Sequence, residues 1–146
     1  MARNLDIESL IEDAFISELP NWIPIEVDVK SWDDLKYTSL TPMIKIKATY
    51  AEEQVGTVNF FIASNVIVDF GVFTSKKIDE NGRIANNIRG NIRSLLNESN
   101  IVDLLNVKDG LLVYSNGVIP SNAVDVSDDK LWQKNLSVLV VATTDN

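Results

Sequence analysis

Residues 43–74, MIKIKATYAEEQVGTVNFFIASNVIVDFGVFT, carry the strongest structural signal in this 146-residue chain. Apolar residues alternate with lysines at its start, which is typical of a strand with one solvent-facing side. Polar breaks at residues 51–53 and 64–65 predict turns. The strands that these turns separate are expected at residues 44–48, 55–63 and 66–74. Because short connections favour antiparallel neighbours, we expect a three-stranded meander here.

A helix is predicted on each side of this section. The first begins after a capping residue, Asn4 or Asp6, and ends at Pro20. The second covers residues 80–98 and contains Gly90, which indicates either close helix–sheet packing or simple tolerance of glycine. Apolar residues recur at helical spacing in both helices: Ile7, Leu10, Ile11, Ala14 and Phe15 in the first, and Ile84, Ile88, Ile92, Leu95 and Leu96 in the second.

Three more strands are expected, at residues 25–29, 111–115 and 131–143, with an Asn-Gly turn at 116–117. The length fits one domain, residues 1–146. The order of elements predicts an α+β fold, a mainly antiparallel β-sheet with two principal helices packed on one face.

The composition argues against catalysis. The sequence has no cysteine and no histidine, which excludes disulfides, thiol and histidine catalysis, and metal sites built on these residues. Its six glycines form no phosphate-binding motif, so we expect no enzyme, cofactor or metal. The acidic pairs Asp33-Asp34 and Asp128-Asp129 are typical of solvated turns. The stretch 79–82 favours helix initiation over a calcium loop, because it lacks the ligand spacing of one.

The net charge of −8 argues against tight nucleic-acid binding. Residues 1–34 hold nine acidic and two basic residues, a net charge of −7. This region is either a solvated face or an acidic face matched to a basic neighbouring surface. The chain contains no apolar run of 18 residues and begins without the pattern of a secretory signal, so we expect an intracellular protein.

Basic residues gather at Lys76, Lys77, Arg83, Arg89 and Arg93. They form a solvated helix face, a docking surface for an acidic neighbour such as another copy, or a weak nucleic-acid patch. Aromatic and apolar residues around Trp32 either pack over the sheet edge or act as an exposed anchor. The candidate interface residues are therefore Glu8, Glu12, Asp13, Trp32, Leu35, Tyr37, Lys76, Lys77, Arg89 and Arg93.

The layout as a whole resembles a known family. An acidic N-terminal helix, a strand and loop before Pro42, and a β-meander lead into an isoleucine-rich helix. A turn with Gly117-Val118-Ile119-Pro120 follows, and Leu131-Trp132 begins a long final strand. This pattern resembles the tail-terminator and neck (head–tail joining) proteins of long-tailed bacteriophages.

The resemblance implies a structural virion protein that forms a ring, hexameric in this family, at the head-proximal end of the tail. Its partners would be other copies of itself, the tail tube, a sheath in contractile tails, and neck or connector proteins. DNA would pass through the channel without specific binding, and assembly would take place in the host cytoplasm. The resemblance brings no catalytic residues.

Two other classes stay open. An acidic assembly or secretion chaperone would bind a partner's apolar segment as a dimer. An enzyme restricted to Asp, Glu, Lys, Ser and Tyr would need a deep pocket with convergent carboxylates.

Overall fold

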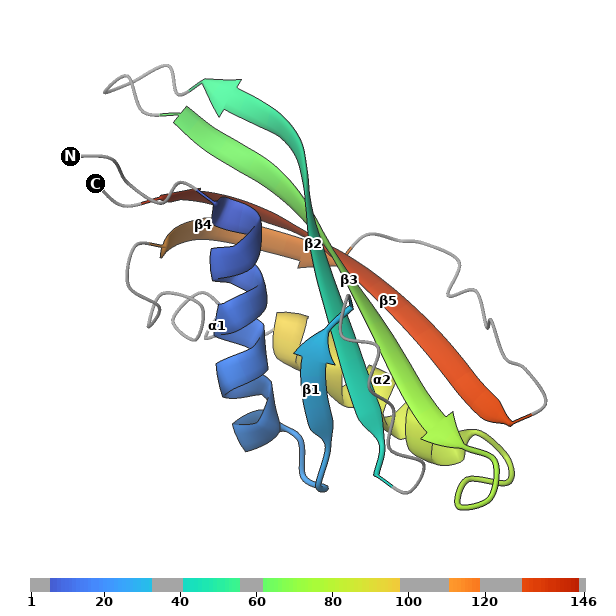
Figure 1. Cartoon of the computed structure of the whole chain (residues 1–146). Helices are drawn as coiled ribbons and strands as arrows, with labels where there is room; N and C mark the ends of the chain where they lie inside the picture. Colours follow the sequence, from blue (N-terminus) through green and yellow to red (C-terminus); the bar gives the residue numbers. More distant parts are fainter. Residues whose placement is uncertain (1–5, 33–40, 56–61, 98–110, 119–129, 145–146) are drawn as a thin grey trace.

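The computed structural model describes residues 6–32, 41–55, 62–97, 111–118 and 130–144. Its elements are α1 (Ile7–Trp22), β1 (Asp28–Ser31), β2 (Met43–Val55), β3 (Ile62–Ser75), α2 (Arg83–Asn97), β4 (Leu111–Val118) and β5 (Leu131–Thr144). The five strands form one sheet in the order β1-β2-β3-β5-β4 (Figure 1). Only β1 and β2 run parallel, and the other neighbours in the sheet are antiparallel. The predicted α+β class is confirmed.

The core lies between the helices and one face of the sheet. Alternate residues of β3, from Val66 to Val72, are fully buried on this face. From α1, the Phe15 ring meets Phe70 edge-on, with 5.1 Å between ring centroids. From α2, the predicted apolar stripe enters the same cluster, with Ile88 and Ile92 fully buried. The strand period of two and the helical period of 3.6 thus place both helices on one face.

Helix α1 begins where the sequence predicts and ends later. Asp6 is the N-cap, and its carboxylate accepts hydrogen bonds from the Ser9 backbone N–H at 3.1 Å and the Ser9 hydroxyl at 2.6 Å. These bonds, the hydroxyl first, lower the pKa of Asp6 from its usual 3.8. The prediction that Pro20 ends the helix is wrong. Proline removes its own N–H donor and crowds the carbonyl four residues earlier, but the N–H groups after it can still bond, and that of buried Ile23 closes a further turn on the Leu19 carbonyl at 3.1 Å.

The predicted three-stranded meander is wrong, because β2 and β3 are two long strands of one hairpin. β2 continues through residues 51–53 with a β-bulge between Tyr50 and Glu52, and β3 runs through residues 64–65. The bulge absorbs the irregularity that the polar break suggested. At the far end, β2 and β3 pair with each other beyond the reach of β5, which joins β3 from Ser64 onward (Figure 1).

The outer strands differ from the predictions to unequal degrees. β1 begins three residues later than expected and ends two later, because pairing with β2 begins at Asp28, whose N–H donates to the Pro42 carbonyl at 2.9 Å. β4 runs through Asn116-Gly117, where a turn was predicted, and keeps its pairing with β5 beyond a bulge after Val113. β5 agrees with its prediction to within one residue. Neither of the described helices is long and apolar enough to cross a bilayer.

Candidate interaction surface

The acidic residues of α1 do not all face solvent. Glu12 accepts hydrogen bonds from the Ser31 hydroxyl and from the Ala48 backbone N–H, both at 3.1 Å. Ala48 lies on β2 just past the end of β1, so Glu12 satisfies a donor of the sheet edge that β1 no longer covers. Glu8 is half-buried, whereas Asp13 is exposed. Of the predicted acidic interface residues, Glu12 therefore has a role within the fold and Asp13 is the most available.

Trp32 packs onto the sheet face opposite the helices. Its backbone N–H donates to the Ile46 carbonyl at 2.9 Å, and its ring reaches across β2 to β3. There it lies over Gly71, where a Cβ would come within 2.7 Å of the indole, and its centroid is 6.0 Å from that of Phe73. This half-buried position fits packing over the sheet, the first of the two interpretations. The other loop candidates, Leu35 and Tyr37, lie outside the described residues.

The two lysines of the basic cluster lie in the turn between β3 and α2. Lys77 is exposed, and the Lys76 ammonium lies 4.5 Å from the ring centroid of Trp132. The buried Lys134 approaches the same ring, at 5.2 Å. Trp132 is held in turn by its indole N–H, which donates to the Asp79 carbonyl at 2.7 Å. Lys76 is thus engaged by the fold, and Lys77 projects beside it.

Asp79 lies before helix α2 and caps its first turn, in agreement with the interpretation of residues 79–82 as a helix start. Its carboxylate is buried and accepts hydrogen bonds from the Ile84 N–H at 3.2 Å and the Ala85 N–H at 3.1 Å. The Thr74 hydroxyl donates a third bond at 2.8 Å. Gly82, with φ of 72°, makes the turn into the helix and lies against Trp132. The carboxylate is therefore used as a helix cap.

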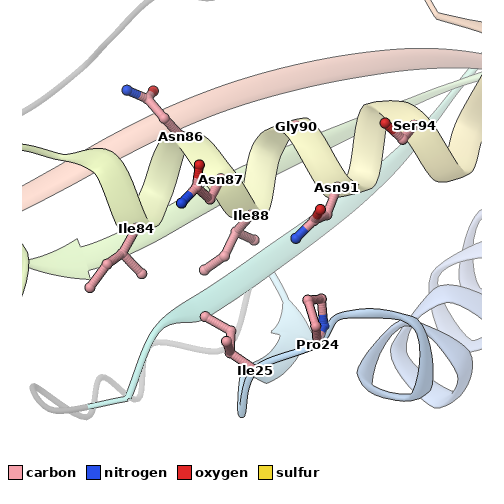
Figure 2. Close-up of a pocket in the computed structure, with 9 residues that line it drawn as sticks. All are labelled: Pro24, Ile25, Ile84, Asn86, Asn87, Ile88, Gly90, Asn91 and Ser94. Carbon is pink, nitrogen blue, oxygen red and sulfur yellow. The ribbon is translucent and has the colours of Figure 1, made fainter.

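A groove lies along one side of α2, between that helix and the segment that follows α1 (Figure 2). We call it the α2 groove. Its volume is about 570 Å³, and its lining residues are Pro24, Ile25, Ile84, Asn86, Asn87, Ile88, Gly90, Asn91 and Ser94. The lining combines amide side chains with aliphatic ones and contains no carboxylate. Such a surface can hydrogen-bond to a neighbouring chain and cover apolar side chains, but it offers no general acid or base.

Arginines accompany this groove along α2. Arg89 is half-buried and donates to the Asn86 side-chain oxygen at 3.3 Å, whereas Arg83 and Arg93 are exposed. The helix contains these three arginines and no acidic residue. The structure therefore brings the predicted Arg89 and Arg93 together on one helix and separates them from the acidic residues of α1.

Within the described part of the chain, no three acidic side chains gather closely enough to hold a metal ion. The acidic pairs Asp33-Asp34 and Asp128-Asp129 lie outside that part. Comparison of the chain with known protein families and with curated proteins gives no match.

The α2 groove was not predicted from the sequence. A signal was present in residues 83–97, because the positions outside the apolar stripe carry asparagine, serine and glycine beside the three arginines, with no lysine or glutamate. Asparagine, serine and glycine are poor helix formers, and their concentration on one exposed face points to a role other than helix stability. The other wall of the groove is formed by Pro24 and Ile25. These residues follow α1 in the chain and lie near α2 only because of the tertiary fold.

Proposed function

We propose that this chain is a structural protein of a long-tailed bacteriophage that forms a homo-oligomeric ring, ends the tail tube and joins the tail to the neck. The observation that carries the proposal is the architecture. An acidic first helix and an arginine-containing second helix lie on one face of a sheet whose longest strands have 13 to 14 residues. Its order of helices and strands follows the order expected from the sequence, with a two-stranded hairpin in place of the expected meander and a strand in place of the turn at 116–117.

The distribution of charge supports self-assembly. α1 carries four acidic residues and no basic one, and α2 carries three arginines and no acidic residue. In a cyclic ring each subunit meets its neighbour through two different surfaces, so one chain must supply both halves of the contact. Two helices of opposite charge are suited to that arrangement. The net charge of −8 also suits a channel through which DNA passes without adhering.

The test is the mass of the purified chain in solution, measured by light scattering after size exclusion, with negative-stain images of the same peak. Six copies of the 16.3-kDa chain give a mass of ~98 kDa. A species of this mass with an open centre is the expected result. If the chain is a monomer in solution, it is next incubated with purified tail tubes. The proposal is contradicted if the chain neither forms rings nor caps the tubes.

A stable dimer without larger species favours the alternative, an acidic chaperone for a partner protein. The α2 groove is the observation behind this alternative, because amide and aliphatic side chains together can cover an apolar segment. The two proposals differ in stoichiometry and in what the groove accepts.

A further inference from the structure

The α2 groove offers space for side chains from outside the subunit. Asn87 and Asn91 project from α2 toward Pro24 and Ile25 on the opposite bank (Figure 2). The two amides are one helical turn apart, so their donors and acceptors repeat about every 6 Å along the groove. Ile84 is half-buried beside them on the same helix and Ile25 is exposed on the other side of the groove, whereas Ile88 is fully buried beneath them. The groove is therefore equipped for a partner that presents both polar and apolar groups.

Gly90 lines the groove without a side chain, so it leaves space open to a partner at this position. It is exposed, and a Cβ built at this position would meet nothing within 4 Å. The fold thus gives no packing reason for glycine, which costs a helix roughly 0.5–1 kcal/mol relative to alanine. An approaching helix can come closer to α2 at this point than at a residue with a long side chain.

The charge around the groove selects an acidic partner. Arg83 and Arg93 are exposed on α2 and form no ion pair with another described residue. Asp13 is exposed near the middle of α1 and is likewise without an ion pair among the described residues. The exposed positions around Asp13 are small, Ser9 and Ser17, so α1 can approach another helix closely. The acidic surface that matches α2 is thus present on the same chain.

We propose that the α2 groove receives α1 of a second copy of this chain, with Asp13 of that copy set against Arg93. The inference rests on the proposed ring and names the contact that builds it. Because α1 and α2 are different surfaces, the contact is heterologous, and its repetition around an axis closes a ring. Partial exclusion of water strengthens the Coulomb attraction of such a pair, against the cost of desolvating both charges, so its main effect is to fix the register of the two helices.

Cysteine cross-linking tests the contact directly, because the chain has no cysteine of its own. Ser17→Cys, one helical turn from Asp13 on the same exposed face, and Ser94→Cys are prepared as separate proteins, mixed at equal concentration and oxidised. The expected product is the mixed dimer, in excess over both homodimers. The matched control is Lys47→Cys, an exposed position on the opposite face of the sheet, mixed with Ser94→Cys. A mixed dimer no more abundant than in this control overturns the proposal.

Two substitutions at one position provide a second measurement. Gly90→Ala fits the open space and is expected to leave self-association unchanged, whereas Gly90→Trp fills the groove and is expected to weaken it at least tenfold. Both variants are expected to melt no lower than the wild type, since nothing surrounds this Cβ. Equal self-association of the two variants overturns the proposed contact. Wild-type rings with no cross-link between residues 17 and 94 leave the ring in place and remove only this contact, so the two proposals fail separately.

Discussion

At the scale of single residues, a side chain's partners decide whether its charge is available. Glu12 and Asp13 are adjacent in α1 and both acidic, but Glu12 points to the sheet edge and Asp13 to solvent. Glu12 accepts a hydrogen bond from the backbone N–H of Ala48, and Ala48 is buried. Glu12→Ala leaves that donor without its acceptor, so we expect a loss of roughly 1–3 kcal/mol in the free energy of unfolding. Urea denaturation measures it, and a loss below ~0.5 kcal/mol, as expected of an ordinary surface position, contradicts the assignment.

Asp79 provides the second prediction at this scale, because its neighbour Glu80 is exposed and serves as a matched control. Asp79→Ala removes the acceptor of two α2 backbone donors and of the buried Thr74 hydroxyl. We expect a loss of roughly 2–4 kcal/mol, from a lost helix cap of about 1 kcal/mol and a buried hydroxyl left without its acceptor. Glu80→Ala is expected to change stability by less than about 0.5 kcal/mol. Equal effects of the two substitutions in thermal melts refute the capping role.

At the scale of elements, the same substitution is expected to have opposite effects in a strand and in a helix. Gly90→Ala in α2 adds a methyl group to open space and improves helix propensity, so we expect a gain of roughly 0.5–1 kcal/mol. Gly71→Ala in β3 places a Cβ about 2.7 Å from the Trp32 indole, which must move away. We expect a loss of roughly 1–3 kcal/mol, accompanied by a change in tryptophan fluorescence. Two effects of the same sign contradict this description.

The elements also mark how far the sequence predicts the fold. β5 and both helices were predicted to within a few residues, because each carries a periodic apolar face that packs into the core. The β2–β3 hairpin was divided wrongly at residues 51–53 and 64–65, because polar residues there pair with one another inside the ladder, next to the β-bulge after Tyr50. At these positions the strands are held by backbone hydrogen bonds, and apolar and polar residues do not alternate. The sequence pattern therefore does not predict the strands there. The prediction of a turn at Asn116-Gly117 was also wrong, because this pair lies inside β4 and its pairing with β5 continues through both residues.

The candidate site was less predictable than the fold. The sequence indicates which residues are charged, but it does not tell that Glu12 is bound to the sheet while Asp13 is free of ion pairs among the described residues. That difference depends on where β1 ends. The α2 groove needed the tertiary arrangement even more, because Ile25 and Asn91 are 66 positions apart in the chain.

At the scale of the whole molecule, the separation of charge between α1 and α2 predicts how assembly depends on salt. Raising the NaCl concentration from 0.1 to 1 M shortens the Debye length from about 10 Å to about 3 Å and weakens attraction between exposed charges. If oppositely charged helices join the subunits, the apparent dissociation constant should rise at least tenfold, equivalent to about 1.4 kcal/mol per contact. Light scattering over a dilution series at both salt concentrations measures this change.

A charge exchange separates this effect from a general response to salt. Asp13→Arg and Arg93→Asp each place like charges at the proposed contact, so either variant alone should assemble more weakly than the wild type at low salt. Combining both substitutions in one chain restores opposite charges across every contact, because each subunit supplies α1 to one neighbour and α2 to the other. The double variant should therefore regain assembly and its salt dependence. Rings that tolerate 1 M NaCl and both single substitutions would instead be held by apolar contacts, and the charges of the two helices would have no part in their assembly.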